Sequence, residues 1–107
     1  MILEIYEHFK SEYPREGCGV IVNDNTFIPC TNIAEELDTF TICPEEFFDI
    51  KFKYNITAIV HNHINAPNTA SESDLNNCKV LQIPYYIFSY PEMELNIVKP
   101  EEIKNAS

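Results

Sequence analysis

Basic residues are scarce in this 107-residue sequence: seven lysines and arginines stand against seventeen aspartates and glutamates, so the formal net charge is −10. A surface of this sign repels phosphate backbones and anionic lipid headgroups at long range. No stretch approaches the roughly 20 apolar residues that a membrane-spanning helix requires, and the first ten residues contain two glutamates and no apolar run typical of a secretion signal. We therefore expect no nucleic-acid partner, no membrane partner and a cytoplasmic protein.

Cysteine is also sparse, with four residues in the whole chain. No two of them have the C-x-x-C spacing that is common in metal and redox sites. Four cysteines are few for a disulfide scaffold, and nothing indicates an oxidising compartment. We expect free, mostly buried thiols at Cys18, Cys30, Cys43 and Cys78.

The length corresponds to one domain, because single hydrophobic cores typically span about 100 to 150 residues. Apolar residues make up 45% of the chain, enough for a core. Residues 1–12 place their apolar side chains on one side of a 3.6-residue period, which predicts an amphipathic helix ending before Pro14. Pro44, followed by two glutamates, favours a second helix start. We expect that helix to bury Phe47, Phe48, Ile50 and Phe52.

The remaining elements follow from short apolar runs separated by turn residues. An inner strand is expected where apolar and β-branched residues precede the first of two closely spaced histidines. The predicted order is a helix over 1–12, strands over 18–22 and 26–31, a polar connection over 32–39, a strand over 39–43, a helix from 44, a strand over 55–60, a loop over 61–73, a helix containing Leu75, Cys78 and Leu81, strands over 84–89 and 93–98, and a polar tail over 99–107. This order predicts an α/β (α+β) fold, a mixed β-sheet flanked by helices.

His61 and His63 are the residues most suggestive of chemistry. They come directly after the expected inner strand, and side chains at i and i+2 of an extended chain project to the same face. Both imidazoles can then reach one metal ion, whereas on a helix they would diverge by about 200 degrees. The spacing predicts a metal site at the end of a strand.

Ser71 and Asp74 follow after seven intervening residues and begin the next expected helix. Two imidazoles and one carboxylate form a three-ligand set that leaves a zinc position open, as in catalytic sites. Serine followed three residues later by an acid is also a capping-box pattern that requires no metal. Both interpretations of Ser71 and Asp74 stay open at this point.

The combination of these residues resembles the JAMM/MPN family of zinc metallopeptidases. His61-Asn62-His63, Ser71 and Asp74 match its metal motif, and residues 13–19 are similar to its upstream Pro-x-Glu-x-Cys-Gly segment. Asn62 stands where the family most often has serine or threonine. Within the family, residues 43–47 and 83–89 are similar to the amino-terminal domain of phage tail assembly proteins, which usually continue into an NlpC-type cysteine peptidase domain. We expect the JAMM/MPN domain over 1–98 with a cytidine-deaminase-like fold, and 107 residues have no room for the second domain.

The resemblance implies a role for each matching residue. His61, His63 and Asp74 would bind Zn²⁺, Glu16 would act as general base towards the attacking water, and Ser71 would donate a hydrogen bond to the developing oxyanion. A peptide or isopeptide substrate follows from the same resemblance, and phage tail proteins are expected partners. If a phage encodes the chain, its location would be the host cytoplasm or the virion tail.

Three other functional classes place different requirements on the sequence. A non-catalytic subunit of a phage tail tip would keep the fold, and the zinc, without hydrolysis. A zinc nucleoside deaminase would require H-x-E and P-C-x-x-C segments, which the sequence lacks. A cysteine peptidase using Cys18 or Cys78 is disfavoured, because no third residue is evident to orient a histidine.

Overall fold

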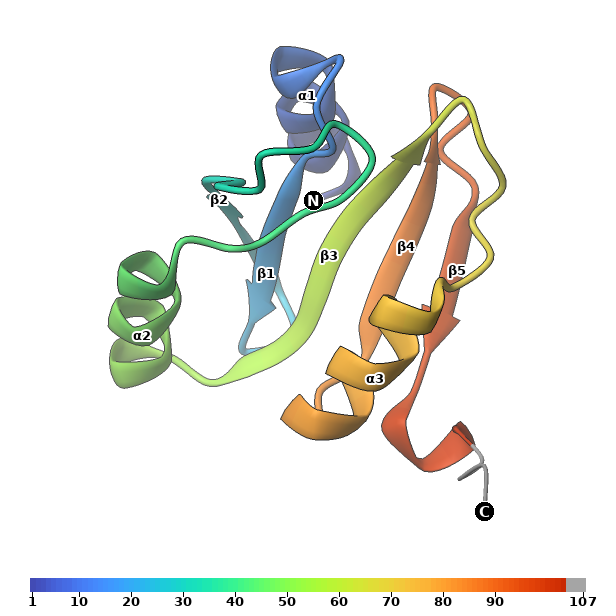
Figure 1. Cartoon of the computed structure of the whole chain (residues 1–107). Helices are drawn as coiled ribbons and strands as arrows, with labels where there is room; N and C mark the ends of the chain where they lie inside the picture. Colours follow the sequence, from blue (N-terminus) through green and yellow to red (C-terminus); the bar gives the residue numbers. More distant parts are fainter. Residues whose placement is uncertain (104–107) are drawn as a thin grey trace.

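The computed structural model describes residues 1–103 and contains a five-stranded sheet with helices on both faces (Figure 1). The elements are α1 (Ile2–Glu12), β1 (Cys18–Val22), β2 (Thr26–Cys30), α2 (Pro44–Lys53), β3 (Ile56–Ile64), α3 (Glu72–Leu81), β4 (Tyr85–Tyr90), β5 (Leu95–Val98) and a short 3₁₀ helix, η1 (Pro100–Glu102). The expected fold, a mixed sheet flanked by helices, is confirmed. Within residues 1–103 no helix is long and apolar enough to cross a bilayer.

The strand order is β2-β1-β3-β4-β5, with β3 in the centre. β3 runs parallel to β4, whereas the other neighbouring strands are antiparallel. The register places His61 between Cys18 of β1 and Ile87 of β4. A side chain at this position is held by strands on both sides, which is a rigid place for a functional group.

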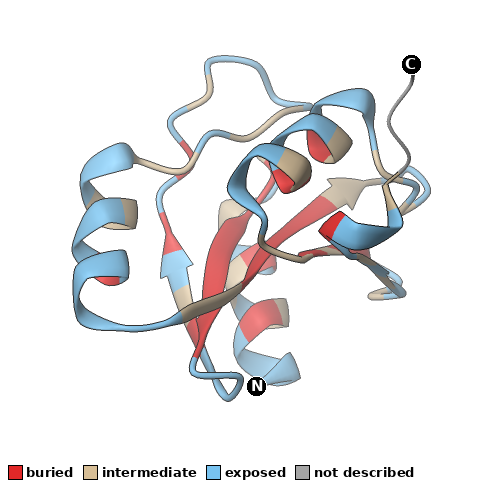
Figure 2. Ribbon diagram, turned by 90° about the horizontal axis from the view of Figure 1, so that it is seen from below, coloured by how far each residue is buried: buried red, intermediate tan, exposed pale blue. Residues whose placement is uncertain are grey.

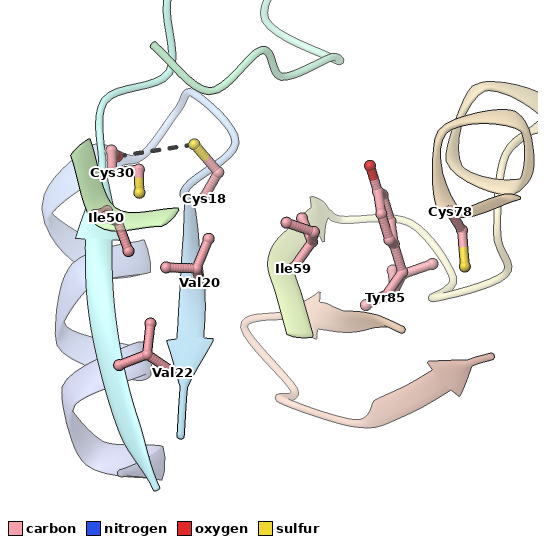
Figure 3. Close-up of a cluster of buried hydrophobic side chains, with 9 residues drawn as sticks. Cys18, Val20, Val22, Cys30, Ile50, Ile59, Cys78 and Tyr85 are labelled. Atoms are coloured by element: carbon pink, nitrogen blue, oxygen red, sulfur yellow. Dashed lines mark hydrogen bonds between the residues drawn. The ribbon is translucent and has the colours of Figure 1, made fainter. Parts of the chain in front are cut away.

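The two faces of the sheet carry different helices. Ile5 and Phe9 of α1 lie four residues apart and pack with Val60 and Phe88 on one face. Ile50 of α2 and Cys78 of α3 pack with other strand residues on the opposite face, where Figure 3 shows the buried cluster. Figure 2 shows that buried residues concentrate in the strands and on the inner sides of the helices. The alternation of side chains along β3 sends His61 and His63 to the face that α2 and α3 cover.

All four cysteines are free, and all except Cys43 are buried, in agreement with the expectation. Cys18 Sγ donates a long hydrogen bond to the carbonyl oxygen of Cys30, 3.7 Å away (Figure 3). Burial raises the pKa of the Cys30 thiol to about 12, with Glu46 and Cys43 adding to the effect. A thiol with so high a pKa stays protonated at neutral pH and is a poor nucleophile.

Two local predictions about the segment around α2 are wrong. Residues 39–43 form no strand, and within residues 1–103 their only pairing is the isolated bridge between Asn32 and Ile42. In α2, Ile50 is buried and Phe47 partly buried, but Phe48 is 66% exposed and Phe52 is 92% exposed. The reason is helical geometry: positions 47 and 50 share a face, and positions 48 and 52 lie on another.

The end of the central strand also differs from the prediction. β3 continues to Ile64, so the histidines belong to the strand and the loop that follows is shorter than expected. Pairing with β4 extends to Ile64 and Tyr90, and these ladder hydrogen bonds hold a polar stretch in extended form.

The expected C-terminal tail begins with η1, whose Pro100 is buried, and Ile103 packs against the core. Residues 104–107 of that tail lie outside the described residues.

Candidate metal centre

His61 and His63 lie on the same face of β3, as their spacing predicted. Their ring centroids are 5.1 Å apart. His61 is 1% exposed at the centre of the sheet, while His63 is only partly buried near the end of the strand. The two imidazoles therefore form one site that is closed on one side and open to solvent on the other.

Asp74 belongs to the first turn of α3 and completes a capping box. Its backbone amide donates to Ser71 Oγ at 3.0 Å, and the Ser71 amide donates to Asp74 Oδ2 at 2.9 Å. The same carboxylate faces the histidines, with Oδ1 2.9 Å from His61 Nε2 and Oδ2 3.3 Å from His63 Nε2. The two interpretations of this pair are thus compatible, because the cap fixes the carboxylate in the position where it faces both imidazoles.

The donor atoms suit a zinc ion. One ligand atom each from His61, His63 and Asp74 lie within 4.8 Å of one another, and ligands at about 2.1 Å in a tetrahedron are about 3.4 Å apart. Both ring nitrogens of His61 are buried without a well-aligned hydrogen bond within residues 1–103, which is a costly state unless another group satisfies them. His63 Nδ1 lies 2.8 Å from the carbonyl oxygen of Pro67. Because a carbonyl oxygen only accepts, Nδ1 carries the proton, and Nε2 of the neutral ring offers a lone pair.

The carboxylates shape the electrostatics of this group. Burial lowers the pKa of His61, but the Asp74 and Glu16 carboxylates outweigh it, so the pKa is raised. The Asp74 carboxylate also raises the pKa of His63 against the effect of burial. Burial opposes ionisation of Asp74, yet the two imidazoles and the Ser71 amide hold its pKa well below the usual range. Asp74 is therefore a carboxylate at neutral pH, as a metal ligand must be.

Glu16 lies beside this group although it is distant from it in sequence. It is 6% exposed, and its Oε1 is 3.4 Å from His61 Nδ1. Antiparallel pairing of β1 with β3 places Cys18 opposite His61, which brings the segment just before β1 to the edge of the site. The sequence-predicted residues Glu16, His61, His63 and Asp74 thus meet in one place, with Ser71 at the adjoining helix start.

Two asparagine side chains form hydrogen bonds with the peptide group that follows Glu16. Its carbonyl oxygen accepts from Asn32 Nδ2 at 2.9 Å, and its N–H, which belongs to Gly17, donates to Asn62 Oδ1 at 2.7 Å. Both asparagines are buried, and they approach from opposite sides of the chain. A Cβ on Gly17 would lie 2.6 Å from the ring of Phe9, so only glycine allows α1 to pack this closely. The backbone at Glu16 is consequently fixed by hydrogen bonds and by packing.

Asn32 also holds the loop that borders the site. Its Nδ2 donates to the carbonyl oxygen of Thr39 at 3.1 Å, and its Oδ1 accepts from the amides of Ala34 and Thr41 at 2.9 and 3.0 Å. With the bond to Glu16, the side-chain amide forms four hydrogen bonds, the full capacity of the group. The loop is therefore anchored to the same segment that carries Glu16.

This loop presents Phe40 to the histidines. Its ring stacks on that of His61 with centroids 4.2 Å apart. The site opens into a cleft of about 560 Å³, whose lining includes Glu36 and Asp38 from the same loop. The cleft is large enough for a short peptide segment, and its acidic wall favours a ligand that is neutral or positively charged there.

Sequence reasoning missed the supporting residues of this site. Asn32 and Phe40 lie in a segment that was expected only as a polar connection and a short strand, and no motif marks them. Asn62 departs from the family pattern, and the structure gives it a specific contact, the Gly17 amide. An asparagine reaches further than serine or threonine, so this contact depends on the longer side chain.

Comparisons with known proteins agree with this architecture. The family of prokaryotic homologs of the JAB domain matches residues 1–98. The tail tip assembly protein K of Escherichia phage N15 is 35% identical over 100 residues, which cover 90% of this chain and 41% of that protein. The chain thus spans less than half the length of this curated relative.

Two solved structures share the fold at lower identity. A protein from Desulfitobacterium hafniense has a TM-score of 0.70 and 20% identity, over 92% of this chain and 75% of that one. A JAB1/MPN domain protein from Archaeoglobus fulgidus has a TM-score of 0.57 and 19% identity, over 92% and 82%. Taken with the family match over residues 1–98 and the relationship to a phage tail assembly protein, these findings show that the chain belongs to the prokaryotic JAB family.

Proposed function

We propose that this domain is a zinc-dependent peptidase or isopeptidase that hydrolyses an amide bond. The observation that supports it best is the buried Glu16 carboxylate, 3.4 Å from His61 at the edge of a cleft that also holds His63 and Asp74. Metal binding alone requires only the three ligand residues. Hydrolysis also needs a general base, and Glu16 is a fourth ionisable side chain that is buried beside the three ligand residues.

Each residue has a task in the proposed reaction. His61, His63 and Asp74 would hold the zinc ion, which supplies a Lewis acid that polarises the scissile carbonyl and makes water a better nucleophile. Glu16 takes a proton from the attacking water and passes it to the leaving amine. Ser71 Oγ already accepts from the Asp74 amide, so its own O–H is free to donate to the developing oxyanion.

The experiment that tests the proposal is Glu16→Gln. This change keeps the size of the side chain and removes the base, so zinc content and thermal stability should stay near wild type while turnover falls roughly 10² to 10⁴-fold. Glu7→Gln, on the exposed side of α1, is the matched control. Peptides from phage tail components and peptidoglycan-linked peptides are the first substrates to screen. Wild-type rates in the Glu16→Gln variant on a verified substrate would contradict the mechanism.

A second candidate function is a non-catalytic assembly subunit of a phage tail tip that binds other tail proteins. The relationship to tail tip assembly protein K of phage N15 favours it. Under this hypothesis the domain acts in the host cytoplasm or in the virion tail, and Glu16→Gln supports tail assembly in an infected cell as well as the wild type does. Loss of infectious particles with Glu16→Gln, in the presence of normal amounts of folded protein, would instead favour the peptidase.

A further inference from the structure

A second cavity lies beside the metal cleft and shares a wall with it. The groove has a volume of about 330 Å³ and lies on the face of the sheet that α2 and α3 cover. Ile59 of β3 and Tyr85 of β4 contribute strand residues to its lining, and Figure 3 shows these two side chains on neighbouring strands. Phe40 lines both the groove and the cleft.

The lining of this groove is chiefly apolar. Phe47 and Phe48 come from α2, and Leu81 comes from α3. Phe48 is 66% exposed and Leu81 is 40% exposed. Large apolar side chains gathered at the rim of a concave surface are typical of a binding site, because covering them removes apolar area from water.

We propose that this groove, which we call the apolar subsite, binds a bulky apolar side chain of the peptide substrate close to the bond that is cut. The proposal rests on the peptidase function proposed above. The occupant is the substrate, because the subsite adjoins the metal cleft and Phe40 lines both.

The distances suit an extended peptide. The ring of Phe40 is 4.2 Å from that of His61, and the ring of Tyr85 is 6.1 Å from it. A peptide advances about 3.3 Å per residue in extended form. A side chain one or two residues from the scissile bond would therefore reach the wall formed by Phe40 and Tyr85.

Charge distinguishes this wall from the rest of the cleft. Glu36 and Asp38 line the metal cleft but not the groove. An apolar side chain is therefore favoured on the groove side of the metal centre, and a neutral or basic side chain is favoured beside the acidic loop. This contrast gives the substrate a preferred direction across the site.

The test compares two synthetic peptides on the zinc-reconstituted Glu16→Gln variant, which should bind without cutting. One is acetyl-Ala-Phe-Ala-Lys-Ala-amide, and the other has alanine in place of phenylalanine. Amide chemical shifts of the isotope-labelled protein give both the affinity and the location. The phenylalanine peptide should bind roughly 10-fold or more tightly, a usual ratio for filling an apolar pocket, and should shift the resonances of Ile59 and Leu81.

Phe48→Gln and Phe52→Gln provide the matched pair of variants, each made in the same background. Both residues are exposed on α2, but only Phe48 lines the groove. Phe48→Gln should abolish the preference for phenylalanine, and Phe52→Gln should leave it unchanged. Equal affinity for the two peptides would overturn the proposal, as would an equal loss of the phenylalanine preference in both variants. A dimer in sedimentation experiments that Phe48→Gln dissociates would also overturn it, because a second copy would then occupy the groove.

Failure of the subsite and failure of the peptidase function give different results. If the wild type cuts both peptides at equal rates and both bind equally, the subsite is wrong and the hydrolytic function stands. If the phenylalanine peptide binds at Ile59 and Leu81 but the wild type never cuts any peptide, the hydrolytic function is wrong, and the groove stands only as a site that binds an apolar side chain.

Discussion

Replacing Asn32 with alanine should destabilise the domain more than any single surface change, although Asn32 is neither a metal donor nor a core apolar residue. The substitution removes four hydrogen bonds, which join Asn32 to the Glu16 carbonyl, the Thr39 carbonyl and the amides of Ala34 and Thr41. The bond to the Glu16 carbonyl is buried, and the other three are partly buried.

The magnitude follows from this difference in burial. A buried carbonyl left without a partner costs about 1 to 3 kcal/mol, and each bond that water can replace contributes about 0.5 kcal/mol. The expected loss in the free energy of unfolding is therefore about 3 kcal/mol for Asn32→Ala. Unfolding entropy scales with chain length, so a domain of this size loses about 4 °C in Tm per kcal/mol, or about 12 °C in all.

Thermal and urea unfolding followed by circular dichroism measures this effect. Asn68→Ala is the control, because the Asn68 side chain donates one exposed hydrogen bond, to the Glu94 carbonyl at 2.9 Å. The bond that Asn68 accepts from Asn96 goes to its backbone carbonyl oxygen and is kept in the variant. Asn68→Ala should lower Tm by no more than about 4 °C. Asn32→Asp keeps the two acceptor contacts but places a carboxylate against two carbonyl oxygens, so it should be no more stable than Asn32→Ala. A Tm for Asn32→Ala within about 3 °C of wild type would refute the reasoning.

Three further predictions concern the metal centre. The purified chain should hold about one zinc ion by elemental analysis, and His61→Ala combined with His63→Ala should hold almost none after reconstitution; equal zinc in both proteins would contradict the ligand assignment. Zinc affinity, measured by competition with a chromophoric chelator, should fall as pH falls. Because the pKa values of His61 and His63 are raised, protons compete with zinc for these imidazoles already above the ordinary histidine pKa of about 6.5. The pKa of Asp74 is lowered, so this carboxylate stays ionised over the same pH range. Ser71→Ala removes the hydroxyl that accepts from the Asp74 amide but keeps the Ser71 amide that donates to the Asp74 carboxylate, so it should lower Tm by about 4 °C, as seen by circular dichroism, and retain zinc. Loss of zinc would show that the backbone amide alone does not hold the carboxylate in position.

Local signals in the sequence were sufficient where neighbouring residues decide the conformation. The period of 3.6 in residues 1–12, the turn residues between the first two strands and the proline at the start of α2 each predicted an element that the structure contains. The capping-box spacing of Ser71 and Asp74 likewise predicted the start of α3. In each case the physical cause lies within a few residues along the chain.

Predictions failed where residues far apart in sequence decide the conformation or the burial of a side chain. β3 extends through His61 and His63 because β4 pairs with it as far as Ile64. The composition of this polar segment does not indicate how far the strand continues. Phe48 was expected to be buried on grounds of hydrophobicity alone. Its exposure depends on which side of α2 packs on the sheet, and Ile50 and Phe47 take that side.

The sequence by itself determined the types and order of most elements, the fold class, and the set of chemical groups at the candidate site: two imidazoles at strand spacing, a carboxylate at a helix start, and Glu16 before a strand. Only the tertiary structure decided how those groups meet. The pairing of β1 with β3 brings Glu16 to within 3.4 Å of His61, and Asn32 and Asn62 clamp the following peptide from two other parts of the chain. The physical reason is that sheet pairing and buried hydrogen bonds join residues far apart in sequence, so their partners cannot be identified from local patterns.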